Sequence, residues 1–347
     1  MKKKFVLLML ALTLGFVVSA CSEDEAEQET LGFNPTQTFT YSDIASWDGM
    51  VTPIKGSGTG SVVETNDTLG FVTIQAASDG WGGLESESIT LDLSTNPYVF
   101  AQINESPDGS NWGMKFVPDN ADESGEWGYY LIPDNSMKWN KYAGVDVRKA
   151  LGEDFVTIYG EEVTGKLWIF AAGGPEATVS VSQIVVTSKL EADLSFQYDE
   201  IATWDGMQTP VEGSGTGSVV ETNDTLEFVT IQAASDGWGG LQSVSVTLDL
   251  SKNPMLFAQI YESPDGSNWG MKFVPDNVDE SGEWGYYLFE DNSYKWNKYA
   301  GVDLRTQLGE DFITLYGEEV TGTLWIFAAG GPEATVSVSQ LLVVNTK

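Results

Sequence analysis

The sequence predicts an all-β protein made of two tandem jelly-roll-like β-sandwich domains. Three observations support this prediction: apolar residues recur with period two, Asp-Gly and Gly-Gly turns separate the runs, and the second half repeats the first. In one such run Val99, Ala101 and Ile103 alternate with Gln102 and Asn104. Short alternating runs bounded by turn residues are typical of antiparallel strands. The nearest approach to a helical stripe, Val147 to Leu151, spans about one turn.

The repeat divides the chain into two modules. Trp-Asp-Gly-Met at 47–50 recurs at 204–207, an offset of 157 that holds without a gap to the end. About four-fifths of the aligned positions are identical, and the 12 Trp form six pairs. A period this long indicates duplication of whole domains rather than a solenoid. We expect module one at 36–189 and module two at 190–347, each long enough for its own core.

The segment before the modules predicts a targeting signal followed by a tether. Three lysines precede a mostly apolar run that ends at Val-Ser-Ala-Cys, the order of a secretory signal. The lone Cys21 after small residues resembles a bacterial lipobox, so we expect a signal peptide at 1–20 and lipidation of Cys21. An ordinary signal or a membrane span is the alternative, but the run is short for a span. The acidic tether at 21–35 resembles the export signal of Bacteroidetes-type surface lipoproteins, which implies an outer-membrane protein facing outward.

Composition excludes several function classes. The chain has no His, which rules out Ser-His-Asp and Cys-His triads and imidazole acid–base catalysis. A single Cys rules out an intrachain disulfide and Cys-rich metal sites. The formal net charge of −34 repels nucleic acid and polyanionic substrates. Contact with the membrane is therefore expected through the lipid anchor only.

Each module resembles galactose-binding-like carbohydrate-binding modules. The motifs are Trp-Gly-Gly at 81–83, Leu-Asp-Leu-Ser at 91–94, Asn-Pro at 96–97 and Trp-Gly-Met-Lys at 112–115, and all recur in module two. This resemblance covers nearly all of each module and implies a β-sandwich that binds carbohydrate. The same sandwich also serves as a structural domain, so the ligand must be argued from the site.

Aromatic and polar residues predict a composite carbohydrate site in each module. Aromatic rings stack on the apolar face of a sugar, while amide and charged groups hydrogen-bond its hydroxyls. In the strand at 112–116 the apolar set Trp112, Met114 and Phe116 predicts a buried face, so Lys115 points the other way. Gln102 and Phe100 are expected to share the face of Lys115. The predicted binding residues are Trp81, Gln102, Lys115, Trp127 and Trp139, with Trp238, Gln259, Lys272, Trp284 and Trp296 in module two.

Metal binding and catalysis are weaker alternatives. The acidic loop with Asp119, Asp122 and Glu123 offers oxygen ligands for a structural calcium ion, against the alternative of a solvated loop without EF-hand spacing. No other cofactor is expected. A glycoside hydrolase needs two carboxylates at a set separation, but 51 acidic residues supply such pairs by chance. We expect no enzyme activity.

The sequence therefore predicts a non-catalytic, lipid-anchored surface protein that captures a polysaccharide. The negative charge favours a neutral glycan, with a β-glucan such as laminarin as the first choice, because screening weakens repulsion of an acidic polymer without creating attraction. A glycan transporter or a surface glycosidase is the expected protein partner. Tyr261 and Tyr294 replace Asn104 and Met137, which predicts tighter binding by module two. A structural or adhesin-like surface protein is the main alternative.

Overall fold

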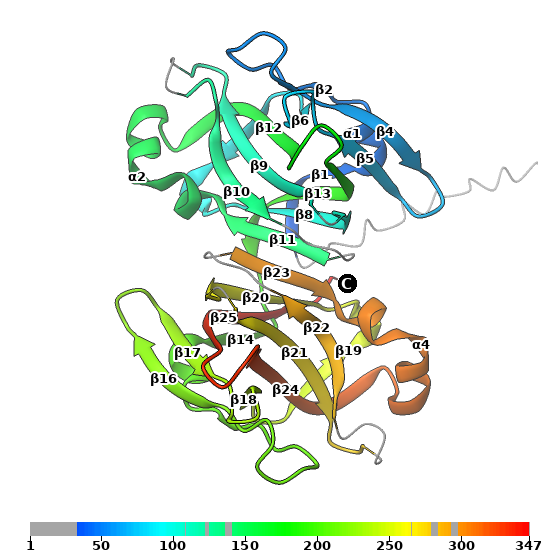
Figure 1. The fold of residues 1–347 in the computed structure, drawn as a ribbon, viewed down its shortest axis with the longest axis vertical. Coiled ribbons are helices and arrows are strands. Elements are labelled where there is room, and N and C mark those ends of the chain that lie inside the picture. The colour runs from blue at the N-terminus through cyan, green and yellow to red at the C-terminus, as the bar shows by residue number, and fades with distance from the viewer. Residues whose placement is uncertain are drawn as a thin grey trace, which may run out of the picture.

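The computed structural model describes residues 33–107, 109–121, 125–135, 141–264, 266–278, 284–292 and 298–346. Within these ranges the chain folds into two β-sandwiches, one per module, as Figure 1 shows. The predicted all-β tandem architecture is confirmed. None of the described helices combines the length and hydrophobicity needed to cross a bilayer.

Module one packs two antiparallel layers against each other. One layer has the order β4-β5-β13-β8-β11, with β1 beside β13, and the other has the order β10-β9-β12-β6-β2, with β3 and β7 at its margins. The strands are β1 (Phe33–Thr40), β2 (Asp48–Gly49), β3 (Gly58–Thr59), β4 (Ser61–Asn66), β5 (Phe71–Gln75), β6 (Trp81–Glu85), β7 (Ile89–Asp92), β8 (Tyr98–Glu105), β9 (Asn111–Pro118), β10 (Tyr129–Asn135), β11 (Lys141–Asp146), β12 (Glu162–Ala172) and β13 (Thr178–Leu190). The helices are α1 (Tyr41–Ala45), α2 (Val147–Tyr159) and a 3₁₀ turn at Leu93–Thr95.

Module two repeats this plan with layers β16-β17-β25-β20-β23 and β15-β18-β24-β21-β22. Its strands are β14 (Leu194–Gln197), β15 (Asp205–Gly206), β16 (Ser218–Asn223), β17 (Phe228–Gln232), β18 (Trp238–Gln242), β19 (Val246–Asp249), β20 (Met255–Glu262), β21 (Asn268–Pro275), β22 (Tyr286–Asn292), β23 (Lys298–Asp303), β24 (Glu319–Ala329) and β25 (Thr335–Val344). Its helices are α3 (Tyr198–Ile201), α4 (Leu304–Tyr316) and a 3₁₀ turn at Leu250–Lys252.

The core of each sandwich follows the alternation of the strands. On β9, Trp112, Met114 and Phe116 have no exposed surface and pack between the two layers, as their spacing predicts. Each fully buried large apolar side chain contributes roughly 1.5–3 kcal/mol by leaving water. Successive strand residues point to opposite faces, so Lys115 lies on the outer face of its layer.

Helix α2 is longer than the sequence predicts. Asp146 caps it by accepting a hydrogen bond from the Lys149 amide at 3.0 Å, and Leu151 and Phe155 bury one face. Gly152 has φ +80° inside the helix, which kinks it and interrupts the helical stripe. The expectation of no more than one turn at 147–151 was therefore wrong.

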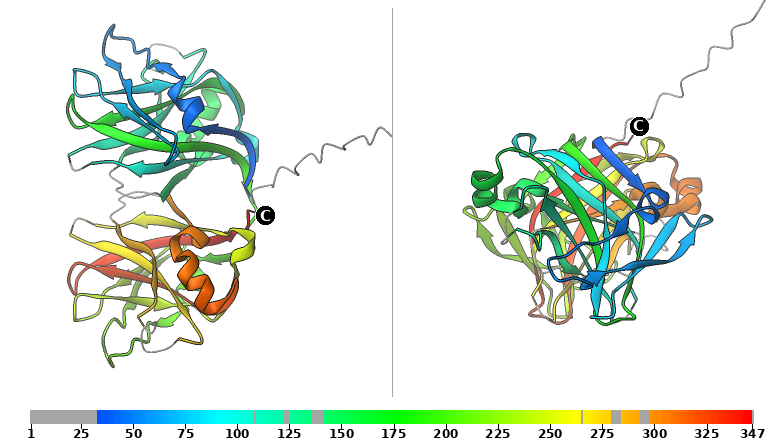
Figure 2. Two further views of the ribbon diagram at one scale, coloured as in Figure 1. Left: turned by 90° about the vertical axis from the view of Figure 1, so that its right-hand side faces the viewer. Right: turned by 90° about the horizontal axis from the view of Figure 1, so that it is seen from above.

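The two modules join edge to edge into one continuous sheet. Strand β11 pairs antiparallel with β23, and Ala143 lies directly opposite Ala300, the same position in the repeat. The pair is therefore the centre of an approximate two-fold axis, as in an isologous dimer. In Figure 1 and the left view of Figure 2 the modules meet at this junction. Pairing also removes two sheet edges that would otherwise be open.

The junction fixes which way both modules face. Directly opposite residues of an antiparallel pair point to the same side of the sheet. Ala143 and Ala300 both belong to the buried core between the layers. The second layer of each module therefore stacks on the same side of the shared sheet. The outer faces of these two layers both lie on that side and point away from the shared sheet.

Aromatic packing seals the opposite side of the junction. Phe100 and Phe257 lie 4.8 Å apart between ring centroids, and Tyr142 and Tyr299 pack beside them. Both Phe side chains are fully buried although they lie outside either sandwich core. The modules are thus joined by strand pairing and by an apolar cluster, with little free linker between β13 and β14.

Candidate functional site

Five side chains gather on the outer face of the second layer of module one. We call this set, Trp81, Lys115, Trp127, Tyr130 and Phe170, the platform. Trp81 begins β6, Lys115 lies in β9, Tyr130 in β10 and Phe170 in β12, while Trp127 occupies the turn before β10. Adjacent strands bring these residues together because Lys115 pairs with Tyr130 and Ala172 pairs with Trp81.

The aromatic rings of the platform contact one another at set angles. Trp81 lies 6.0 Å from Trp127 at 39° between ring planes and meets Phe170 edge-on at 5.9 Å. Tyr130 also approaches Phe170 edge-on, at 6.3 Å. Tyr130 is 48% exposed, whereas Phe170 is buried and Trp81 and Trp127 are half-buried. The buried ring of Phe170 therefore supports the rings of Trp81 and Tyr130, which reach solvent.

Lys115 supplies the positive charge of the platform. Its ammonium lies 4.2 Å from the centroid of the Tyr130 ring and 5.8 Å from that of Trp81, within cation–π range. It also donates a hydrogen bond to the Trp127 carbonyl at 2.9 Å. Only 7% of Lys115 is exposed, so its ammonium is held by the rings rather than free in solvent. This fixes a hydrogen-bond donor among aromatic surfaces.

A loop between β2 and β3 holds Trp81 in place. Gly58 has φ +69°, and a Cβ there would lie 2.9 Å from the indole, so only glycine allows this approach. Asp79 pins the loop by accepting hydrogen bonds from the Ser57 hydroxyl at 2.6 Å and from the Gly58 amide. The Ser57 hydrogen bond holds the pKa of Asp79 below its usual value. The loop is therefore anchored at the foot of the platform.

The same loop covers the centre of the sheet face. Met50 is fully buried and packs with Trp168 and Phe170. Trp168 is 1% exposed, so it caps the sheet instead of lining a surface, and its indole Nε1 has no hydrogen-bond partner. Trp168 therefore has no surface on which a sugar could stack.

Module two carries a second platform of the same residue types. Trp238 lies 6.0 Å from Trp284 at 41°, and Tyr287 meets Phe327 at 6.3 Å. The Lys272 ammonium lies 4.1 Å from the Tyr287 centroid and donates to the Trp284 carbonyl at 2.9 Å. Trp284 and Tyr287 are 38% and 42% exposed. The fold thus builds the same surface twice.

Gln102 and Gln259 do not join the platforms, so the expectation that Gln102 shares the face of Lys115 was wrong. Both lie on the shared sheet, in β8 and β20, while the platforms lie on the other layer of each sandwich. Gln102 accepts a hydrogen bond from Gln183 at 3.1 Å, and Gln183 also contacts the Tyr142 hydroxyl near the junction. Alternation showed that these residues point away from a core, but not which layer carries them.

Tyr261 is also remote from the module-two platform. It lies in β20 of the shared sheet and stacks on Phe228 at 4.3 Å and 21° between planes. This removes one of two residues on which tighter binding by module two was predicted. The other, Tyr294, lies outside the described residues.

Several other predicted residues also lie outside the described residues: Cys21, Asp122, Glu123, Trp139 and Trp296. Asp119 is described, and its carboxylate accepts a hydrogen bond from the Ser88 hydroxyl at 2.7 Å. Over the ranges that the structure describes, no group of three or more acidic or Cys side chains is placed to hold a metal ion.

Asp146 and Arg148 have structural roles around helix α2. Asp146 caps α2, and Arg148 donates to the Leu93 carbonyl and to the carboxylates of Glu153 and Glu161. These contacts tie α2 to the 3₁₀ turn and to β12.

Tyr130 and Phe170 are platform residues that sequence reasoning missed. Tyr130 belongs to the aromatic run Trp-Gly-Tyr-Tyr at 127–130, and Phe170 alternates with Leu167 and Ile169 on its strand. The signal was therefore present in the parity of β12, but the pairing of β12 with β6 and β9 was needed to bring it to Trp81.

Comparison with known proteins gives only distant structural likeness. No family model matches the chain, and no curated protein matches it. A tandem CBM22 domain pair from Xyn10C of Paenibacillus barcinonensis is 10% identical, with 91% of this chain and 98% of that chain covered, at a TM-score of 0.29. The 11S allergen of Cocos nucifera is 10% identical, with 92% of this chain and 91% of that chain covered, at a TM-score of 0.20. YhaK of Escherichia coli is 9% identical, with 87% of this chain and 92% of that chain covered, at a TM-score of 0.18. These TM-scores are too low to support an argument about function.

Proposed function

We propose that the chain is a non-catalytic glycan-binding protein whose two platforms capture one neutral polysaccharide. The observation that carries this proposal is the duplicated platform, in which partly exposed Trp and Tyr rings surround a fixed lysine. Rings of this kind stack on the C–H face of a pyranose, and the lysine fixes the arrangement of the rings through its cation–π contacts. The five platform residues include no carboxylate that could act as an acid or a nucleophile.

The arrangement of the modules supports binding of a polymer. Both platforms lie on layers stacked on the same side of the shared sheet. A polymer bound at one platform is therefore held near the other, and the second binding event is governed by effective concentration. Such coupling raises avidity by about 10²–10⁴ without any new contact, provided the geometry allows simultaneous binding.

Charge supports a neutral ligand. The chain carries 51 acidic against 17 basic residues, so a polysaccharide with uronate or sulfate groups meets a repulsive field. We propose a β-glucan such as laminarin as the first ligand to test. Lipidation at Cys21, display on the outer face of the outer membrane, and a transporter or surface glycosidase as partner remain part of the proposal. Their support is the sequence of residues 1–35 and the resemblance to surface lipoproteins.

Affinity electrophoresis of the mature chain tests this proposal. The gels contain laminarin, other neutral polysaccharides, or anionic polysaccharides, each at the same mass concentration. We expect retardation by at least one neutral polymer, none by the anionic ones, and no release of reducing ends. Released product would replace the proposal with a glycoside hydrolase, and absence of retardation by every polymer would replace it with a structural or adhesin-like protein.

A further inference from the structure

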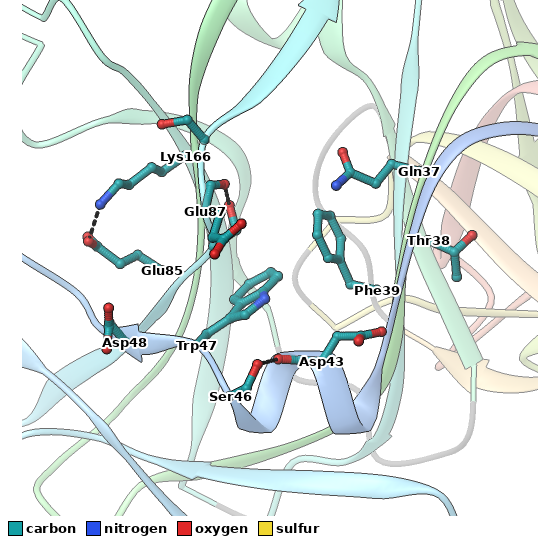
Figure 3. Close-up of a pocket in the computed structure, with 12 residues that line it drawn as sticks. Gln37, Thr38, Phe39, Asp43, Ser46, Trp47, Asp48, Glu85, Glu87 and Lys166 are labelled. Carbon is teal, nitrogen blue, oxygen red and sulfur yellow. Dashed lines mark hydrogen bonds and ion pairs between the residues drawn. The ribbon is translucent and has the colours of Figure 1, made fainter.

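Module one contains a second cavity, away from its platform. It has a volume of about 690 Å³, within the roughly 300–1,000 Å³ range of small-molecule sites. Figure 3 shows it between β1, the α1–β2 corner, the end of β6 and the middle of β12. We call this cavity the groove. Its lining includes Gln37, Trp47, Asp48, Glu85, Glu87 and Lys166.

A buried ion pair forms one wall of the groove. Glu85 is 5% exposed, and its Oε1 accepts a hydrogen bond from the Lys166 ammonium at 2.5 Å. Its Oε2 accepts from the Val51 amide at 3.0 Å. Lys166 retains 38% of its side-chain exposure. The carboxylate is thus fixed in position, and the ammonium beside it still reaches solvent.

The indole ring of Trp47 lines the same groove. Trp47 is half-buried and is held edge-on by Phe39, with centroids 5.1 Å apart and 82° between planes. Figure 3 shows the Trp47 ring between the strand that carries Glu85 and the strand that carries Phe39. An aromatic surface next to a fixed donor and a fixed acceptor is the arrangement that recognises a sugar ring.

Module two shows that the fold does not need this charged pair. At the matching position Gln242 Oε1 accepts the Gln208 amide at 2.8 Å, so a neutral amide makes the same backbone contact. Thr323 replaces Lys166, and Val244 replaces Glu87. A buried ion pair is often no more stabilising than a neutral replacement, because both charges lose water. The charged pair is therefore not required for this backbone contact, and its charges distinguish the groove of module one.

Several of the residues that line the groove differ between the modules, whereas those of the platform do not. All five platform residues are identical in the two modules, whereas Glu85, Glu87, Lys166 and Gln37 face Gln242, Val244, Thr323 and Leu194 in the alignment. Trp204, the counterpart of Trp47, is 8% exposed and belongs to the core cluster. The groove chemistry thus belongs to module one alone.

We propose that the groove binds a neutral saccharide of one or two rings, with Trp47 stacking on the ring and the Glu85–Lys166 pair bonding adjacent hydroxyls. Lys166 compensates the charge of Glu85, so this wall offers hydrogen bonds rather than an unpaired charge, which favours a polyol over an ammonium ion. Asp48 and Glu87 nearby disfavour acidic sugars. This site is separate from the platforms and does not depend on the proposed function.

The test follows the tryptophan indole signals of the mature chain by ¹H–¹⁵N NMR. Neutral mono- and disaccharides are titrated into the wild type and into W127A/W284A, which lacks the exposed indoles of both platforms. We expect the Trp47 signal, assigned with W47F, to shift in both proteins while the Trp204 signal stays in place. The variant E85Q/K166T installs the residues of module two, and we expect it to fold and to weaken the Trp47 response at least tenfold.

Three results would overturn the groove proposal. The first is a Trp47 signal that responds to no neutral sugar, and the second is an equal response in E85Q/K166T. The third is a response to methylammonium alone, which would assign the groove to cations. The Trp47 signal of W127A/W284A reports on the groove even if the platforms bind no polysaccharide. The groove proposal and the platform proposal can therefore fail independently.

Discussion

The platform residues are identical in the two modules, whereas several groove residues differ between them. The platform has the same residues and nearly the same geometry in both modules, with Trp–Trp centroid distances of 6.0 Å in each. The groove keeps its tryptophan position but changes its ion pair to Gln242 and Thr323. After duplication, one surface was held constant while another changed. This contrast is expected if the platform is the binding unit that we propose for both modules, and it makes the groove a feature of module one.

The shared sheet makes the comparison between modules a controlled one. Ala143 opposite Ala300 relates the modules by an approximate two-fold axis, so equivalent variants occupy equivalent surroundings. Differences between such variants then report on the few residues that differ.

The largest effect is expected for the core tryptophans of the two modules. Trp112→Ala and Trp269→Ala each remove a fully buried side chain and should lower the free energy of unfolding by about 3–5 kcal/mol. Their surroundings match except that Trp269 packs against Phe289, 5.4 Å between centroids, where module one has Ile132, so the two costs should agree within about 1 kcal/mol. Chemical denaturation followed by circular dichroism measures them. A large inequality would show that the modules differ in stability despite their shared sequence.

The next effect is the loss of avidity when one platform is removed. Trp127→Ala or Trp284→Ala should weaken binding to an immobilised neutral polysaccharide by about 100-fold, because a single platform no longer gains from effective concentration. Surface plasmon resonance measures both variants. We expect equal losses, since the platforms are identical in residues. A loss confined to one variant would show that only that module binds.

A pH-dependent effect is expected at the junction. Burial lowers the pKa of Lys141 to about 8, although the nearby charge of Glu290 acts to raise it. Between about pH 8 and 10.5 the unfolded chain holds a proton that the folded chain has released, so stability rises with pH in this window. Lys141→Met should therefore raise the free energy of unfolding at pH 7 by on the order of 2 kcal/mol and remove this rise.

The junction prediction is read by denaturant titrations between pH 7 and 9.5. Burial raises the pKa of Tyr142 to about 12, so the stability linked to its proton is lost only as pH rises from about 10 to 12. This loss lies above the range of the titrations. Exposed Lys55→Met serves as the control and should change stability little. An unchanged pH profile in Lys141→Met would contradict the assigned role of Lys141.

The smallest effect is expected at Tyr261. Tyr261→Asn installs the module-one residue at a position on the shared sheet, so glycan affinity should change less than about twofold while the stacking on Phe228 is lost. Isothermal titration of the full chain with a binding oligosaccharide measures this. A marked loss of affinity would restore the expectation that Tyr261 makes module two the tighter binder.

The sequence was informative where local pattern decides structure. Alternation on β9 predicted that Trp112 is buried and that Lys115 faces outward, because a strand has only two faces. It did not predict helix α2, whose buried Leu151 and Phe155 are spaced as on a helix but are separated by Gly152 in a positive-φ conformation. A local break of this kind hides the period that sequence reading depends on.

Long-range pairing limited what could be predicted for the sites. Gln102 was placed with Lys115 because both point outward, but the layer that each strand joins depends on pairing far along the chain. The groove was missed because Trp47, Glu85 and Lys166 come from three distant segments. One signal was available: Glu85, Glu87 and Lys166 are all changed in module two, and clustered differences between near-identical repeats mark a surface that has diverged.

The most direct test of the duplicated platform is affinity electrophoresis of W127A/W284A beside the wild type in a neutral polysaccharide that retards the wild type. The account predicts that the double variant, folded as judged by its unchanged unfolding transition, migrates as it does in a gel without polysaccharide. Retardation equal to that of the wild type would contradict the account, because it would place the polysaccharide site away from both platforms.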